Sequence, residues 1–346
     1  MFKVLSLFTG MGGMDVGFAE EMQVHRKSID PQFVDRESEI KDFVYLKRLP
    51  FEIVFQNDIL KCARDISDWN NWSHNYVSKD IRSLLDEDYN FPQADVVCGG
   101  FPCQDFSHSG KRKGLESNRG TLYQCFVEVV KRTKPKMFIA ENVHGLLTMK
   151  NEPIKQIISD FSQAGYDVKY QLIKCEEYGV PQTRWRVIIL GIRNDLKPEL
   201  PDDWNIINYN KRCTTLNDYF SHLTEPEETS DSAQMVYSKA AKLDKGQGQK
   251  EVCLNQPGPT MRAEHHGNIE FRRLHDGKNN ENNLKQRRLT IREAALIQTF
   301  SPNVILTNPN KTPNMSGYKP IGNAVPPLLG YLVAFKIYEI LKIINQ

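Results

Sequence analysis

Three features are absent from this 346-residue sequence, and each absence argues against a class of protein. No run of about 18 apolar residues occurs, so we expect no membrane-spanning helix. The N-terminus has no charged region leading into a long apolar core, so we expect no signal peptide and a protein that stays in the cytoplasm. No Cys-x-x-Cys pair occurs among the seven cysteines, so neither a zinc site nor a thioredoxin-type motif is indicated.

The net charge of the chain is only +2, so it indicates little about binding partners. The stretch 262–292 is more informative, with eight Lys and Arg against four Asp and Glu, and three His besides. Such a segment is either a solvated surface or a face that contacts phosphates. The apolar content of 40% is ordinary for a soluble globular protein.

Short apolar runs alternate with helical patterns over the first half of the chain, which predicts a mainly parallel α/β sheet. The expected strands are residues 4–8, 51–55, 94–98, 137–140 and 187–192, and the expected helices are residues 122–132 and 153–164. The pattern changes at about residue 195, where Asn, Asp, Pro and Gly become frequent. A capping-box pattern at Thr290 and Glu293 then opens a short helix, and a last helix is expected over residues 326–344.

We therefore expect two domains. The larger combines residues 1–194 and 287–346, and a smaller domain of residues 195–286 is inserted between these parts. Residues 25–50 form an additional charged stretch between the first two strands, to which the sequence assigns no role.

A glycine-rich turn follows the first strand, with Gly10, Gly12 and Gly13 ahead of a helical pattern. In α/β proteins such a turn holds a nucleotide-like ligand, although a plain tight turn is an equally good interpretation of the glycines alone. Asp58, after the second strand, is placed to accept hydrogen bonds from ribose hydroxyls, and Asp80 to contact an adenine ring; otherwise both are surface carboxylates. Pyrophosphate binding is disfavoured because Gly17 breaks the third-glycine spacing of the NAD pattern.

Cys103 follows the strand at 94–98, in the sequence Gly-Gly-Phe-Pro-Cys-Gln over residues 99–104. The glycines and Pro102 fix the backbone, and a polar, basic loop comes next, so the pKa of this thiol can be lowered. Cys98 belongs to the strand itself and is expected to be buried and inert. Glu141 follows the next strand and should emerge at the same sheet edge. Alternation along residues 182–186 would place Gln182, Arg184 and Arg186 on one face.

Taken together, these motifs resemble the DNA (cytosine-5) methyltransferases of the bacterial restriction–modification type. The matching segments follow the family's order over nearly the whole chain, and they are residues 8–13, 100–107, 141–143, 182–186, 288–293 and 322–327. The resemblance implies a Rossmann-like fold for an S-adenosylmethionine-dependent methyltransferase. The mostly parallel sheet would carry helices on both faces, with a target recognition domain at 195–286. Asp58 stands where the family commonly has Glu.

The resemblance also implies roles for individual residues. The cytosine is flipped out of the duplex, Cys103 attacks its C6, Glu141 holds or protonates N3, and Arg186 contacts O2. Matched cofactor contacts are Phe8, Gly10, Gly12, Gly13, Asp58, Asp80, Ile81, Pro102, Leu122, Asn323 and Val325. Candidate DNA contacts are Gln104, Ser107, Ser109, Arg184, Arg262 and His265. The implied partner is double-stranded DNA, with a monomeric enzyme and a cognate restriction endonuclease that acts on the same site.

Three other functions compete with this one. A tRNA cytosine-5 methyltransferase would share the fold, but the long segment at 195–286 and the Phe-Pro-Cys-Gln context favour DNA. A DNA-binding relative without catalysis is disfavoured because Cys103, Glu141 and Arg186 are all present. An NAD-dependent oxidoreductase is disfavoured by the glycine spacing. Neither the DNA sequence recognised nor the cytosine methylated follows from these residues.

Overall fold

The computed structural model describes residues 1–102, 122–150, 152–196, 206–237, 251–263, 272–275, 287–312 and 314–345. Within these ranges no helix is both long and apolar enough to cross a membrane. Cys103, Gln104, Ser107, Ser109 and His265 lie outside the described residues.

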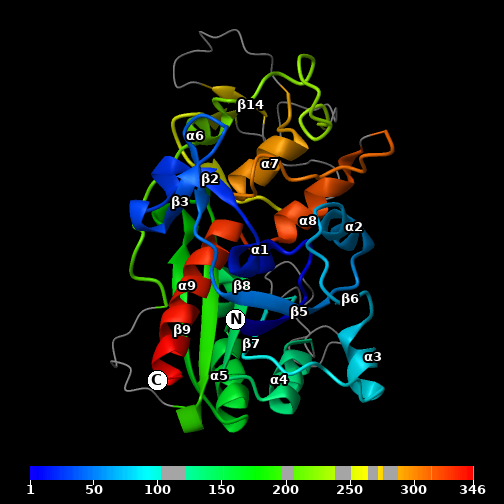
Figure 1. The fold of residues 1–346 in the computed structure, drawn as a ribbon, viewed down its shortest axis with the longest axis vertical. Helices are drawn as coiled ribbons and strands as arrows, with labels where there is room; N and C mark the ends of the chain where they lie inside the picture. Colours follow the sequence, from blue (N-terminus) through cyan, green and yellow to red (C-terminus); the bar gives the residue numbers. More distant parts are fainter. Residues whose placement is uncertain are drawn as a thin grey trace.

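A mixed, mostly parallel sheet forms the centre of the molecule (Figure 1). Its order is β6-β5-β1-β7-β8-β11-β9 in the part of the chain that the structure describes. The strands are β1 (Phe2–Leu7), β5 (Phe51–Asn57), β6 (Tyr76–Val77), β7 (Val96–Gly99), β8 (Met137–Val143), β9 (Tyr166–Lys174) and β11 (Trp185–Arg193). Neighbours from β6 to β8 are parallel, whereas β11 runs antiparallel to both β8 and β9.

Helices cover both faces of the sheet because its central strands are apolar on both sides. Within β7, Val96 and Cys98 join one core cluster and Val97 joins the other. The first cluster includes side chains of α1 (Gly13–Ala19), α2 (Lys61–Trp69) and α9 (Pro327–Ile344). The second includes side chains of α3 (Ile81–Asp86), α4 (Leu122–Thr133) and α5 (Pro153–Gln163). The expected fold class is confirmed.

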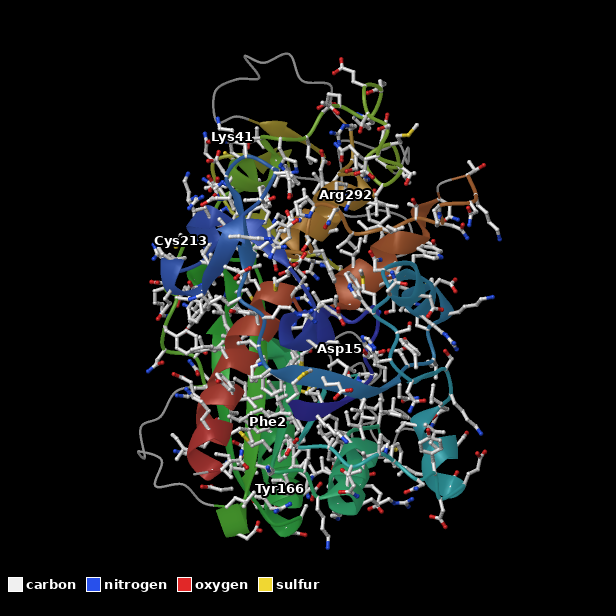
Figure 2. The ribbon with its side chains drawn as sticks, in the orientation of Figure 1. Phe2, Asp15, Lys41, Tyr166, Cys213 and Arg292 are labelled. Atoms are coloured by element: carbon white, nitrogen blue, oxygen red, sulfur yellow. The ribbon has the colours of Figure 1, made fainter. Side chains whose placement is uncertain are left out.

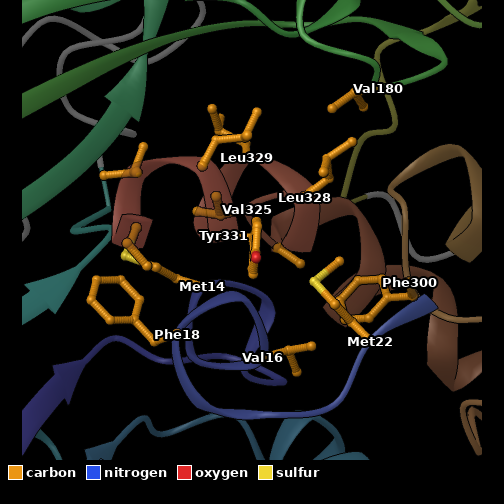
Figure 3. Close-up of a cluster of buried hydrophobic side chains, with 14 of the residues drawn as sticks. Met14, Val16, Phe18, Met22, Val180, Phe300, Val325, Leu328, Leu329 and Tyr331 are labelled. Carbon is orange, nitrogen blue, oxygen red and sulfur yellow. The ribbon is translucent and has the colours of Figure 1, made fainter. Parts of the chain in front are cut away.

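Helices α1 and α9 lie against each other at very short range (Figure 3). A Cβ on Gly13 would overlap the carbonyl oxygen of Val325, and one on Gly17 would overlap the backbone of Gly330 and Tyr331. Met14, on the same helix, packs into the surrounding apolar cluster. The spacing of Gly13 and Gly17, which does not fit pyrophosphate binding, therefore serves helix packing.

Residues 25–50 contribute two strands and the end of a third to a small antiparallel sheet of order β2-β4-β3. Its strands are β2 (Gln23–His25), β3 (Val34–Glu37) and β4 (Phe43–Leu46). The segment after β2 supports α6 (Leu216–Phe220): Lys27 pairs with Asp218 at 2.7 Å, and Ser28 shares a 2.7 Å hydrogen bond with Tyr219. This charged stretch thus forms a base for part of the segment 195–286.

Figure 1 shows α7 (Ile291–Ile297), α8 (Tyr318–Asn323) and the short strand β14 (Arg272–His275) in its upper part. Further short strands are β10 (Gln182–Thr183), β12 (Glu251–Cys253) and β13 (Gly258–Pro259). Short 3-10 helices are Arg26–Ser28, Pro31–Phe33, His144–Leu147, Cys175–Glu177, Asn194–Leu196 and Met315–Gly317. The expected capping box is confirmed, since Thr290 caps α7 and Glu293 returns the bond.

Candidate active site

The ends of three neighbouring strands meet at one edge of the sheet. Gly99 of β7 is in register with Leu7 of β1 on one side and with Ala140 of β8 on the other. Chemistry in α/β proteins gathers at this carboxyl edge. The chain continues from Gly99 through the buried Phe101 to the exposed Pro102, where the described stretch ends one residue before Cys103.

Glu141 and Arg186 form an ion pair at this edge. Arg186 Nε lies 2.6 Å from Glu141 Oε1, and the two side chains are only 12% and 10% exposed. The contact is ionic rather than a well-aligned hydrogen bond, and Arg186 also donates from Nη1 to the carbonyl oxygen of Trp185 at 2.8 Å. At such low exposure, screening by water is weak. The pair therefore offers a carboxylate and a guanidinium side by side.

The backbone that leads to Cys103 lies directly on this pair. A Cβ on Gly100 would come within 2.7 Å of Glu141 Oε2, so only glycine leaves the carboxylate in place. Asn142 donates from Nδ2 to the carbonyl oxygen of Phe101 at 3.2 Å. The segment 141–143 is thus hydrogen-bonded to residues 100–102, which lead to Cys103, as their shared sheet edge predicts.

The glycine turn after β1 has a left-handed backbone at Phe8, Gly10 and Gly12, with φ of 52°, 57° and 86°. A Cβ at Gly10 would meet nothing within 4 Å, so open space lies beside the turn. Asp15 supports the turn from below. Its carboxylate accepts hydrogen bonds from the Ser6 hydroxyl at 2.6 Å, from the Thr9 hydroxyl and from Gln56 Nε2 at 2.7 Å.

Asp15 is fully enclosed, and Figure 2 places it in the middle of the molecule. Burial raises the pKa of this carboxyl, while the three donors lower it. A buried carboxylate with several donors ties its neighbours together. The sequence reasoning missed Asp15; an acidic residue in the first turn of a helix that follows a glycine turn was the available signal.

Asp58 also braces the glycine turn. Its carboxylate accepts from the backbone N–H of Gly10 at 2.9 Å and of Leu60 at 2.7 Å. Burial raises the pKa of Asp58, and Lys319 acts in the opposite direction. The Tyr76 hydroxyl donates to the carbonyl oxygen of Gly10 at 3.0 Å, from the other side of the turn.

Asp80 caps the N-terminus of α3 and pairs with Arg82 at 2.6 Å, and this partner lowers the pKa of Asp80. Ile81 is buried behind it. Leu122, the first residue of α4, is half-buried. On the opposite side of the turn, Val325 is buried against Gly13, whereas Asn323 is exposed. The matching segments 8–13 and 322–327 are therefore in contact.

An open cleft of about 510 Å³ lies beside the ion pair. Its wall includes Arg186, Thr260 and Trp185, whose indole is 40% exposed. The indole is nevertheless held in place, because its Nε1 donates to Glu176 Oε1 at 2.9 Å and its ring meets His144 edge-on. The sequence reasoning singled out neither Trp185 nor His144.

The family model of the C-5 cytosine-specific DNA methylases matches residues 2–339. The chain belongs to that family. This DNA cytosine-5 methyltransferase is 33% identical over 365 residues to the Type II methyltransferase M.BspRI of Lysinibacillus sphaericus, covering 98% of this chain and 82% of the relative. It is 31% identical over 372 residues to M.FnuDI of Fusobacterium nucleatum, covering 98% and 95%.

Among solved structures, the Dnmt2 methyltransferase of S. pombe shares the fold, with a TM-score of 0.70 at 18% identity over all of both chains. Family and fold together imply S-adenosylmethionine as the methyl donor of this methyltransferase. Open space lies beside Gly10, and Asp58 next to it is half-buried. This arrangement suits a ligand that carries no phosphate against the turn and offers hydroxyl groups to the carboxylate.

The methyltransferase does not present Arg184 to DNA as expected. This side chain is 1% exposed, and its guanidinium donates to three backbone carbonyls, those of Met261, Gly322 and Ala324. Burial and then the charge of Arg186 lower the pKa of Arg184 to about 9, so it stays charged at neutral pH. The expected alternation fails because the strand is interrupted at Arg184, which separates it from Arg186.

The basic segment 262–292 also contains both buried and exposed arginines. Arg287, Arg288 and Arg292 are buried, and Arg287 and Arg292 pair with Glu293 and Asp231 at 2.7 and 2.6 Å. These three arginines therefore support the fold and do not face phosphates. Arg262, by contrast, is exposed.

Proposed function

We propose that this methyltransferase modifies a cytosine within a specific DNA sequence through a covalent bond between Cys103 and C6. One observation carries the proposal: the Glu141–Arg186 pair lies against Gly100, three residues before Cys103. A nucleophile, a carboxyl group and a guanidinium at one edge suit a ring that must be attacked at one atom and polarised at others.

In the proposed mechanism, the cytosine leaves the base stack, because C5 and C6 are out of reach within the duplex. The Cys103 thiolate forms a bond to C6 while Glu141 holds or protonates N3 and Arg186 contacts O2. The added electron density makes C5 nucleophilic. S-adenosylmethionine supplies the methyl group that C5 takes up. Loss of the C5 proton and breakage of the Cys103–C6 bond then release 5-methylcytosine and restore the thiolate.

The proposed cofactor site has the turn at Phe8, Gly10, Gly12 and Gly13 as its floor. Asp58 would accept the ribose hydroxyls, and Asp80 with Ile81 would contact the adenine. Pro102, Leu122, Asn323 and Val325 complete the proposed set. Asp58 and Asp80 already accept backbone and Arg82 hydrogen bonds, so each would use its remaining lone pairs for the ligand.

We further propose residues 195–286 as the target recognition domain, between catalytic parts 1–194 and 287–346. Gln104, Ser107, Ser109, Arg262 and His265 are its proposed DNA contacts together with the nucleophile loop. We also propose that the enzyme acts as a cytoplasmic monomer and protects a site from a partner endonuclease. The Type II names of the relatives support the protective role. Bisulfite sequencing of DNA from cells expressing the protein tests this directly. We expect a cytosine that resists bisulfite conversion in one sequence context.

The same preparation distinguishes the rival substrate. Transfer of labelled methyl groups to duplex DNA is expected, and transfer to tRNA is not. Labelling of tRNA alone would contradict the proposal and leave the fold and family unaffected.

A further inference from the structure

Two buried side chains hold the backbone of Met261 from both sides. Gln182 Oε1 accepts from the N–H of Met261 at 2.7 Å, and Arg184 Nη1 donates to its carbonyl oxygen at 2.9 Å. Gln182 is 0% exposed and Arg184 is 1% exposed. Both polar groups of this one residue are therefore tied to the segment between β9 and β11.

The same two side chains lead to Ala324. Arg184 Nη2 donates to the Ala324 carbonyl at 3.1 Å. Gln182 Nε2 donates to Gln298 Oε1 at 2.6 Å, and Gln298 Nε2 donates to the same Ala324 carbonyl at 3.0 Å. Two hydrogen-bonded paths thus join Met261 to Ala324 through the interior. We call Gln182, Arg184 and Gln298 the buried bridge.

A third contact joins the two segments without any side chain. A Cβ on Gly322 would overlap the carbonyl of Arg262 and come within 2.6 Å of the Ala263 nitrogen, so the 262–263 peptide lies flat on this glycine. The side chain of Arg262 is exposed. On the other side of Ala324, Val325 rests on Gly13 of the cofactor turn. The backbone of Arg262 is thereby fixed relative to that turn.

We propose that the buried bridge and Gly322 are positioning residues: they fix the position of Arg262 relative to the active site. This inference rests on the proposed function, since it takes Arg262 as a DNA contact. A buried polar network is stiff, because displacing any member leaves a buried group without its partner. Small displacements of a contact residue are costly in binding. The ligand concerned is duplex DNA, and the bridge acts on its affinity and sequence preference.

A double-mutant cycle tests the inference. Arg262→Ala in the otherwise native protein should raise the KM for cognate DNA about tenfold, as expected for one lost DNA contact. Gly322→Ala and, separately, the isosteric Gln298→Met should each raise the same KM. In either background, Arg262→Ala should add less than about twofold, because the contact is already displaced. The affinity for S-adenosylmethionine, measured by calorimetry, and kcat at saturating DNA should change by less than about twofold.

Tyr166→Phe is the matched control for lost stability. The Tyr166 hydroxyl donates a buried 2.8 Å hydrogen bond to the Pro135 carbonyl, at the far end of the molecule (Figure 2). It should lower Tm without changing the KM for DNA. The inference is overturned if the effect of Arg262→Ala multiplies with those of Gly322→Ala and Gln298→Met, or if kcat falls at constant KM. The proposed function would stand in either case. A native protein that methylates no DNA would overturn both.

Discussion

Arg186 meets Glu141 across two antiparallel strands, with Nε and Oε1 2.6 Å apart and both side chains nearly covered. The partner across the ladder from Arg186 is Val143, and that of Glu141 is Ile188, so the two charged groups approach diagonally. This diagonal contact puts the guanidinium beside the carboxyl group, and the other carboxylate oxygen lies next to Gly100, three residues before Cys103.

The ion pair predicts a large effect of Arg186→Met on catalysis. Loss of the guanidinium should lower kcat about 10²-fold or more, since one preorganised donor to a developing charge contributes about that much. Arg186→Lys should recover only part of the rate, because an ammonium lacks the planar fork. Labelled methyl transfer measures both. Arg193→Met, in the same strand but paired with Asp195 at 2.7 Å, is the control and should keep kcat; equal losses at both positions would contradict the assignment.

Gly100 gives a second prediction, because a Cβ there would reach within 2.7 Å of Glu141 Oε2. Gly100→Ala should displace the carboxylate and lower kcat by about tenfold or more, as one misplaced catalytic group does. In a Glu141→Gln background the same substitution should cost little further activity. An independent loss of equal size in both backgrounds would show that Gly100 acts through something other than Glu141.

Substitutions at Gly13 and Gly17 should distinguish an effect on cofactor binding from an effect on helix packing. Both glycines abut α9, but only Gly13 lies next to the glycine turn. Gly13→Ala and Gly17→Ala should both lower Tm, as overpacking does. Only Gly13→Ala should weaken S-adenosylmethionine binding, by about tenfold, when calorimetry is done below both melting temperatures. Similar weakening by Gly17→Ala would remove the distinction.

His222 predicts a dependence of stability on pH. Burial, with the charges of Arg292 and His25 nearby, lowers the pKa of His222 to about 4. Its ring packs on Phe43 and has no hydrogen-bond partner among the described residues. The unfolded histidine titrates near 6.5, so its stabilising effect is complete above about pH 6.5 and is lost as the pH falls toward 4.

His222→Phe should therefore flatten the decline of the free energy of unfolding between pH 7 and about pH 4.5. Urea unfolding at several pH values measures this. His25 has its pKa lowered by burial too, so some decline should remain in the variant. Curves of identical slope for the variant and the native protein would contradict the assignment to His222.

Much of the catalytic fold could be predicted from local sequence patterns. The strand expected at 94–98 appears as β7 (Val96–Gly99), and the helix expected at 153–164 as α5 (Pro153–Gln163). These elements have continuous apolar runs or helical spacing that determine their type. Strand β9 was not predicted, because this edge strand carries lysine, aspartate and glutamine among its apolar residues. The antiparallel direction of β11 follows from tertiary pairing, which no local pattern encodes.

The site could be predicted where chemistry and strand ends coincide, as for Glu141 and Arg186, but not where burial decides. Arg184 and Arg186 belong to the same motif, yet Arg184 is part of the buried bridge whereas Arg186 pairs with the Glu141 carboxylate. Spacing along the chain cannot distinguish them, because the strand break between them appears only once β10 pairs with β13. The support that Asp15 gives the turn likewise depends on Gln56, 41 residues away.

The central claim is that Cys103 attacks cytosine C6, and covalent trapping tests it most directly. Duplex DNA with 5-fluorocytosine at the methylated position would be incubated with enzyme and S-adenosylmethionine, because fluorine cannot leave as a proton does and the adduct persists. Peptide mass spectrometry should find the adduct on Cys103, and none with Cys103→Ser. Cys98 is 0% exposed, and burial raises the pKa of its thiol; an adduct there, or one that survives Cys103→Ser, would contradict the account.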